Sequence, residues 1–289
     1  MIDQEKLQGR RVVASISGGK DSGAMSLYLH EHGISHDRVF LDTGWEHPLT
    51  YEYLRGPLTN KIGTIIELRA PQSMESLITK KGMFPSRRIR FCTQELKVLP
   101  MQSYLRARID SGEDVINAVG IRANESAERS RMLEWEWQDG FDCEVWRPLL
   151  RWTEEDVISI HKRHGLTPNP LYLMGASRVG CWPCINARKS EIRLVADSDP
   201  DRIIRIRRLE EVVAEAALQR AERDGRHLHS MPTWFQSRQK EPIGWPIDRV
   251  VAWSRTIRGG TEEDRQERLF ESLNDGCMRW GLCDTGGRQ

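Results

Sequence analysis

The sequence lacks several features that would assign it to a special class of protein. It has no apolar run long enough to cross a bilayer, and its first eleven residues, MIDQEKLQGRR, contain no apolar signal core. Its 43 basic and 42 acidic side chains leave a net charge of +1, so no overall field points to nucleic acid or to a membrane. Six cysteines in 289 residues are too few for a disulfide scaffold and are expected to be free, catalytic or metal-bound. These absences predict a cytoplasmic protein without a membrane partner.

Short β-branched runs alternate with helical segments over the first 165 residues. Strands are predicted at residues 11–17, 38–44, 63–69, 114–122 and 143–150. Two helices between them are expected to be interrupted, one near Gly56-Pro57 and one at Pro100. This alternation predicts an α/β fold with a doubly wound parallel sheet.

The pattern changes to loops and helices from about residue 166. Helices are predicted at residues 200–225, 247–257 and 261–276. The sequence therefore predicts an α/β domain at 1–165 and a cysteine-containing helical C-terminal region at 166–289 that packs on it.

The hexapeptide SGGKDS lies between the first predicted strand and the helix that follows it. A glycine-rich turn exposes backbone N–H groups, and the helix start adds partial positive charge, so the two together form an anion site. Gly18 and Gly19 permit positive φ and close approach, and Lys20 can neutralise a phosphate. The hydroxyls of Ser17 and Ser22 can donate to phosphate oxygens. An ordinary tight turn is the alternative interpretation.

The same hexapeptide resembles the PP-loop, SGGxDS, of the ATP pyrophosphatase superfamily at every fixed position. It differs from the Walker pattern GxxxxGK[ST]. The resemblance implies cleavage of ATP between its α and β phosphates, with AMP left on a substrate oxygen. It further implies ATP and Mg²⁺ as cofactors, a catalytic role for Lys20 and Asp21, and nucleotide contacts from Ser17, Gly18, Gly19, Lys20, Asp21 and Ser22. Asp21 would help to place Mg²⁺.

Three further segments, within a match that covers roughly residues 10 to 190, resemble the PAPS reductase family of that superfamily. They are FLDTGWEHPLTYEYL (40–54), RRIRFCTQELKVLP (87–100) and GIRANESAERS (120–130). The resemblance implies a PP-loop, Rossmann-like fold, with nucleotide contacts from Asp42, Thr43, Gly44, Gly120, Arg122 and Arg129. An arginine can clamp a phosphate bidentately, so Arg122, a catalytic candidate, and Arg129 would hold charge on the leaving group. For Asp42 a turn or cap role is the alternative.

The chain departs from the sulfonucleotide reductases of that family in two ways. It lacks their acidic-Cys-Gly-Leu-His motif, since its end reads WGLCDTGGRQ, and it keeps the complete loop that they tend to lose. The resemblance therefore favours an adenylating sulfurtransferase nearest to the DNA phosphorothioation and phage-borne branches. Its partners would be an adenine nucleotide, a sulfur donor such as a cysteine desulfurase, a DNA or tRNA acceptor, and a second copy in a homodimer. The alternatives are a PAPS or APS reductase and a non-catalytic nucleotide-binding subunit of a modification or defence complex.

Two cysteine pairs stand out in the second half of the chain. Cys181 and Cys184 form a CxxC, and Cys277 and Cys283 form a C-x5-C. Four thiolates can complete a tetrahedral zinc site or hold a [4Fe–4S] cluster. The C-x5-C spacing is longer than is usual for zinc, and related branches hold a cluster, so a [4Fe–4S] cluster is favoured, with zinc or free thiols as alternatives.

Cys92 follows the basic run RRIRF, whose charges are expected to depress the pKa of the thiol. It is a candidate to carry a persulfide or to serve as an alternative cluster ligand, against the interpretation of a packed cysteine. The basic segments 86–91 and 202–208 would follow a nucleic-acid backbone or form solvated faces. His161 is interpreted as a surface or capping residue.

Overall fold

The computed structural model describes residues 2–228, 230–235, 244–256 and 280. Within this part of the chain six strands form one sheet, in the order β3-β2-β1-β4-β6-β5. They are β1 (Arg11–Ile16), β2 (His36–Asp42), β3 (Ile66–Arg69), β4 (Val115–Val119), β5 (Trp135–Gln138) and β6 (Cys143–Trp146). All pairings are parallel except that of β5 with β6. The predicted doubly wound α/β fold is confirmed, and the antiparallel edge strand β5 is an addition that the sequence analysis missed.

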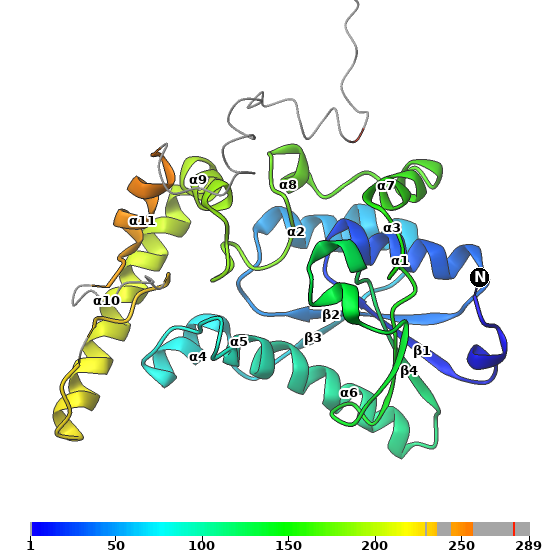
Figure 1. The fold of residues 1–289 in the computed structure, drawn as a ribbon, viewed down its shortest axis with the longest axis horizontal. Coiled ribbons are helices and arrows are strands. Elements are labelled where there is room, and N and C mark those ends of the chain that lie inside the picture. Colours follow the sequence, from blue (N-terminus) through cyan, green and yellow to red (C-terminus); the bar gives the residue numbers. More distant parts are fainter. Residues whose placement is uncertain (1, 229, 236–243, 257–279, 281–289) are drawn as a thin grey trace, which may run out of the picture.

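Helices cover both faces of the sheet because its central strands are apolar on both sides (Figure 1). Val12, Ala14 and Ile16 of β1 face a core that also contains buried residues from the first set of helices. That set is α1 (Lys20–Glu31), α2 (Pro48–Tyr53), α3 (Thr59–Ile62) and α7 (Glu154–Arg163). Val13 of β1 points to the opposite face, where α6 (Leu99–Asp110) packs.

The two interrupted helices continue through wide turns instead of breaking. A π-helical turn, η2 (Leu54–Leu58), contains Pro57 and joins α2 to α3. A second π-helical turn, η3 (Gln94–Val98), joins the short α5 (Phe91–Thr93) to α6, which carries Pro100 in its first turn. Since proline has no N–H, a widened turn or a helix start accommodates it without losing a hydrogen bond.

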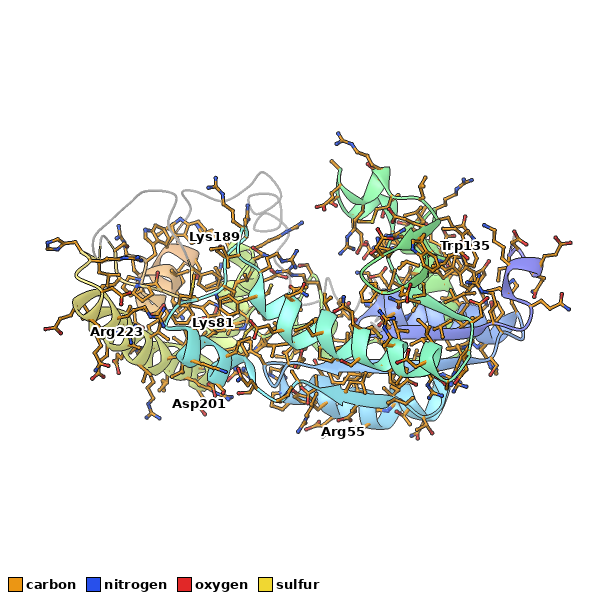
Figure 2. All side chains as sticks on the ribbon, turned by 90° about the horizontal axis from the view of Figure 1, so that it is seen from below. Arg55, Lys81, Trp135, Lys189, Asp201 and Arg223 are labelled. Carbon is orange, nitrogen blue, oxygen red and sulfur yellow. The ribbon has the colours of Figure 1, made fainter. Side chains whose placement is uncertain are left out.

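A second core lies beside the sheet and joins the two halves of the chain. It packs α4 (Met74–Lys81) against α9 (Lys189–Ser198), α10 (Pro200–Arg223) and α11 (Ile247–Ser254). The predicted helices 200–225 and 247–257 are confirmed as α10 and α11, whereas 261–276 lies outside the described residues. Figure 2 shows Lys81 of α4 and Arg223 of α10 at one end of the molecule, and Trp135 of β5 at the other. The division at residue 165 stays a prediction, and this core takes side chains from both sides of it.

The chain also forms four short helical elements among the described residues. They are the 3₁₀ turns η1 (Glu5–Leu7), η4 (Ala123–Glu125) and η5 (Arg129–Arg131), and the one-turn helix α8 (Pro170–Leu173). Where the structure describes the chain, none of its helices combines the length and the apolar character needed to cross a membrane.

Candidate functional site

The loop between β1 and α1 has one conformation that only glycine suits at its second position. Gly18 has a φ of +73°, and a Cβ added there would lie 3.1 Å from Cγ2 of Thr50. The loop is closed by its own hydrogen bonds, because the Ser17 N–H donates to Ser22 Oγ (3.1 Å) and Ser22 Oγ donates to the Gly19 carbonyl (3.0 Å). Ser17 Oγ also accepts from the Gly19 N–H (3.3 Å). The two hydroxyls that were predicted to face a phosphate thus also shape the loop.

Three residues from beyond residue 160 hold this loop from outside. The Lys20 N–H donates to the Tyr172 hydroxyl (3.1 Å), and Asn169 Nδ2 donates to the Gly18 carbonyl (3.2 Å). The His161 ring bonds through Nε2 to the Lys20 carbonyl (2.8 Å). The interpretation of His161 as a surface residue is wrong: it is 1% exposed, and burial lowers its pKa, so the ring is neutral. Asn169 and Tyr172 belong to the segment NPLY, which caps and forms α8. That segment was their signal in the sequence.

Charges of alternating sign surround the start of α1. Lys20 is buried, with Nζ 3.4 Å from Glu154 Oε1 and 3.9 Å from Asp21 Oδ2. Asp21 Oδ1 in turn accepts a 2.5 Å hydrogen bond from Nε of Arg122, which follows β4 and is also buried. Gly120 permits this approach, because a Cβ there would lie 3.0 Å from the Asp21 carbonyl oxygen. The structure therefore brings together Lys20, Asp21 and Arg122, three of the charged residues that the sequence singled out.

Arg129 lies one step farther out. It pairs with Glu125, whose Oε2 also accepts from the Arg122 N–H (3.0 Å). Arg129 is therefore linked to the loop only through Glu125 and Arg122, and its direct contact with a nucleotide stays a prediction.

The predicted residues at the end of β2 are tightly bonded. Asp42 is buried, and its carboxylate accepts from the Gly44 N–H (2.8 Å), the Tyr51 hydroxyl (2.6 Å) and Arg69 Nε (2.5 Å). Burial works to raise the pKa of Asp42, but these donors lower it overall. Thr43 Oγ1 donates to Glu46 Oε1 (2.8 Å) and lies 3.8 Å from Cys181 Sγ. Asp42 has the bonds of a turn residue, and nucleotide binding by Asp42, Thr43 and Gly44 stays a prediction.

The CxxC segment is attached to this same edge of the sheet. Glu46 and Cys181 form an isolated antiparallel bridge, and the Trp182 N–H donates to the Trp45 carbonyl (2.8 Å). Cys181 and Cys184, distant in sequence from the first strands, thereby lie at the carboxyl ends of those strands.

Two cations lie near these thiols. Burial lowers the pKa of Lys97, but Cys181, Glu46, Cys184 and Cys92 raise it more. Burial raises the pKa of Cys181 to about 11, and the charge of Lys97 opposes this shift. Arg178 is a second cation close to Cys184. Lys97 is therefore close enough to the three described cysteines of this region to interact electrostatically with each of them.

The expectation of a depressed pKa for Cys92 is wrong. Cys92 is partly buried behind the basic run, and burial raises the pKa of its thiol, an effect that Thr93 and Arg90 offset only in part. An exposed basic segment next to it in sequence does not outweigh the loss of hydration. A catalytic role for Cys92 stays a prediction.

The structure describes two of the four predicted metal ligands, Cys181 and Cys184. Cys277 and Cys283 lie outside the described residues, and within residues 2–228, 230–235, 244–256 and 280 no three His, Cys, Asp or Glu side chains are arranged to hold a metal ion. Cys181 and Cys184 fit as two ligands of an anionic centre, because Lys97 and Arg178 lie beside them.

Trp280, which stands between Cys277 and Cys283 in the sequence, packs near the loop that precedes α1. It is buried, with its ring 5.2 Å from that of His161 and 6.1 Å from that of Tyr172. Both of those residues bond directly to the backbone of Lys20. Trp280 thus lies beside two of the side chains that support the loop.

A cavity of about 210 Å³ lies on the face of the sheet that α6 covers. Its lining includes Ser15, two residues before the loop, and Val119 and Ile121, which flank Gly120. Asn117 and Arg147 bring polar groups to it, neither of them predicted from the sequence. The full lining is Ser15, Leu41, Lys97, Val98, Met101, Asn117, Val119, Ile121, Gln138, Phe141, Val145 and Arg147.

Known proteins resemble this chain at several levels. The family model for the phosphoadenosine phosphosulfate reductase domain matches residues 11–187. An uncharacterized 37.8 kDa protein of Escherichia phage 186 is 32% identical, over 91% of this chain and 92% of that protein. The adenosine 5′-phosphosulfate reductase of Deinococcus radiodurans is 31% identical over 54% of this chain, which spans 59% of that enzyme. The crystal structure of the PAPS reductase from Candida auris aligns with 63% of this chain and 86% of that one, at 19% identity and a TM-score of 0.48.

Proposed function

The chain belongs to the phosphoadenosine phosphosulfate reductase family, and on that premise we propose that it is an ATP-dependent, pyrophosphate-releasing sulfurtransferase. The observation that carries the proposal is the complete loop with Lys20, Asp21 and Arg122 joined in one charged network at its helix start. An enzyme that cleaves ATP needs such fixed donors where charge develops on the departing pyrophosphate.

In the first step, the transfer of AMP from ATP to the acceptor, each loop residue would have its own role. The Gly18 N–H and the Lys20 ammonium group would hold the β and γ phosphates, since the Gly19 and Lys20 N–H groups donate to Ser17 and Tyr172. Asp21 would place Mg²⁺. An oxygen of the acceptor attacks the α phosphorus, the bond from that phosphorus to the bridging oxygen breaks, and pyrophosphate leaves beside Arg122. The base would occupy the 210 Å³ cavity.

The second step replaces the activated oxygen by sulfur. A sulfur nucleophile attacks the acceptor atom that carries the adenylate, and AMP departs with the oxygen. Cys181 and Cys184, with Cys277 and Cys283, would hold a [4Fe–4S] cluster, or zinc as the alternative, and a cluster would supply redox or sulfur-binding chemistry there. Lys97 would stabilise thiolate charge at that place. The sulfur acceptor would be DNA or tRNA, and the sulfur donor would be a cysteine desulfurase. The enzyme would act as a homodimer.

A reductase acting on PAPS or APS is the second candidate, and the match to adenosine 5′-phosphosulfate reductases favours it. It predicts sulfite release without cleavage of ATP. The complete SGGKDS loop and the absence of the acidic-Cys-Gly-Leu-His motif from the sequence argue for the first candidate.

The test uses the full chain purified without oxygen, with iron, zinc and sulfide analysis of each preparation. Conversion of ATP to AMP and pyrophosphate is measured with water, DNA or tRNA as the acceptor. Lys20→Ala should lower this rate at least tenfold, whereas Lys61→Ala, which removes an exposed lysine of α3, should leave it unchanged. Sulfite release from PAPS or APS without ATP would establish the reductase instead, and ATP binding without turnover would establish a non-catalytic subunit.

A further inference from the structure

Positive charge is concentrated in the segment that joins α4 to α5. Residues 79–90, TKKGMFPSRRIR, contain five basic and no acidic side chains, in a chain whose net charge is only +1. Arg87, Arg88 and Arg90 are exposed, and none of them pairs with a carboxylate of any residue that the structure describes. A local excess of unpaired cations attracts a polyanion.

Other exposed arginines of this protein are already neutralised. Arg55 donates through Nε and Nη2 to the two carboxylate oxygens of Glu67, at 2.8 and 2.9 Å. Arg207 binds Asp248 in the same two-pronged way, at 2.8 and 2.7 Å. The three guanidinium groups of the 79–90 segment have no such partner among the described residues, so their donors remain for a ligand.

The turn that carries these arginines is held in one shape. The Ser86 N–H donates to the Ile89 carbonyl (3.0 Å), and the Ile89 N–H donates to Ser86 Oγ (3.0 Å). Phe84 and Phe91, on either side of the turn, are buried in the core that α10 and α11 complete. A turn that is ordered before binding loses little conformational entropy when a ligand binds to it.

The turn also leads directly to the cysteines of the candidate site. Cys92 comes two residues after Arg90, whose charge acts on the thiol. Cys92 and Cys181 both pack against the core that contains Phe84 and Phe91. A long anion bound to the turn would therefore lie next to the cysteines of the proposed second step.

We propose that Arg87, Arg88 and Arg90 bind the sugar–phosphate backbone of a nucleic acid and hold this acceptor beside the cysteines. The inference rests on the proposed function and deepens it, because it locates the acceptor. Arginine binds phosphate oxygens bidentately, and the repeated phosphates of one strand can engage several arginines at once. Ile89, which is 53% exposed among the arginines, offers an apolar contact to a sugar or a base.

The experiment titrates the full chain into a labelled DNA duplex, its single strand and the RNA of the same sequence, with fluorescence anisotropy as the readout. Salt is varied between about 50 and 200 mM. The wild type should bind at least one of the three, with an affinity that falls as salt rises. The nucleic acid that binds most tightly identifies the class of acceptor.

The double variant Arg87→Ala/Arg88→Ala should lower the affinity at low salt by at least about tenfold. It should also reduce the slope of log affinity against log salt by roughly 1–2, because two phosphate contacts are lost. The control Lys61→Ala/Lys162→Ala removes two exposed lysines of α3 and α7 and changes the net charge equally. It should keep the wild-type affinity and slope.

The variant Arg87→Lys/Arg88→Lys tests the contacts more finely. It keeps both charges but loses the planar fork, so it should retain the salt slope and lose only part of the affinity. Thermal unfolding of each variant verifies that it is folded. Should Arg87→Ala/Arg88→Ala fail to fold, the single variants Arg87→Ala and Arg88→Ala decide the question, each with an expected loss of roughly 1 in the slope.

Two outcomes overturn the inference. One is a wild type that binds none of the three nucleic acids, and the other is an equal loss of affinity in the alanine double variant and in the lysine control. If Lys20-dependent cleavage of ATP with water as the acceptor is nevertheless observed, the proposed ATP chemistry stands without this surface. Binding that depends on Arg87 and Arg88, without Lys20-dependent cleavage of ATP, supports the surface and overturns the proposed function.

Discussion

His36 shows how burial decides the protonation of a single side chain. It lies at the start of β2 with Nε2 2.7 Å from Ser26 Oγ and Nδ1 2.8 Å from the Ile34 carbonyl. The carbonyl requires the proton on Nδ1, which leaves Nε2 to accept from the serine. Burial lowers the pKa of His36 to about 4, although the bond to Ile34 acts in the opposite direction.

This shift predicts a loss of stability in mild acid. Above the ordinary pKa of 6.5 the ring is neutral in both the folded and the unfolded chain, so it contributes no pH dependence. Below pH 6.5 the unfolded chain takes up a proton first, and the free energy of unfolding should fall by on the order of 3 kcal/mol by pH 4. His161, whose pKa is also lowered by burial, adds to the fall.

Urea unfolding between pH 4 and 8 checks this expectation. His36→Gln should flatten the curve by the contribution of one group, and His227→Gln, at an exposed histidine that follows α10, should not. A His36→Gln curve with the wild-type slope would contradict the assignment.

Among elements, the turn from β1 into α1 has a backbone that its surroundings constrain. Gly18 and Gly33 lie at the two ends of α1 and have similar positive φ, +73° and +69°. A Cβ at Gly18 would meet Thr50 and Leu54, whereas a Cβ at Gly33 would meet nothing within 4 Å. Variants at these two glycines therefore separate the energetic cost of backbone strain from the cost of steric crowding.

Alanine at either glycine should cost about 1–2 kcal/mol of folding free energy through the left-handed backbone alone. Gly18→Ala should cost more than Gly33→Ala, and it alone should weaken ATP binding, because the loop must shift to admit the methyl group. Thermal unfolding and nucleotide titration of both variants measure the two effects. Equal losses of stability and unchanged ATP affinity would show that the side chains of Thr50 and Leu54 move aside without an energetic cost.

The carboxylate of Glu210, on helix α10, binds backbone groups of the segment that follows this helix. Glu210 is buried, and its two oxygens accept from the Trp234 and Ile247 N–H groups, each at 2.9 Å. Glu210→Ala leaves both donors buried without a partner, which should cost roughly 2–4 kcal/mol. Glu211→Ala, its exposed neighbour on the helix, should change stability by less than about 0.5 kcal/mol. Urea unfolding followed by tryptophan fluorescence compares them, and equal midpoints would refute the role of Glu210.

The sequence predicted those elements whose signals are local. The SGGKDS loop, the strands β1, β2 and β4, and the amphipathic α10 all follow from spacing and composition over short windows. The strand β5 was missed because WEWQ is four residues long and half of it is polar. The hydroxyl of Tyr172 on the Lys20 N–H was missed because 152 residues separate the two. Likewise, the pKa of Cys92 depends on what buries it, which neighbouring arginines in the sequence do not reveal.

At the scale of the whole molecule, the predicted boundary at residue 165 cuts through shared structure. Asn169 and Tyr172 bond to the loop before α1, and Trp45 stacks on Trp234 with ring centroids 4.8 Å apart. Phe84 also belongs to the core that α10 and α11 complete. The first 165 residues alone would therefore expose part of a core and lose two supports of the site.

A fragment of residues 1–165 should fail to fold cooperatively, whereas residues 1–256, which also contain α8 to α11, should unfold in one transition. Circular dichroism, gel filtration and urea unfolding of the two fragments make the comparison. A monomeric 1–165 fragment with a sharp transition and Lys20-dependent ATP binding would establish an independent domain and overturn this expectation.

The bond between Lys20 and Tyr172 also sets an order of events during synthesis. A ribosome adds roughly 5–20 residues per second, so the loop emerges roughly 8 to 30 seconds before the tyrosine that supports it, 152 residues later. For that interval the nascent chain carries the SGGKDS turn without the hydroxyl that accepts from its Lys20 N–H. A newly made chain thus acquires the finished site only when its second half has been translated and has folded back.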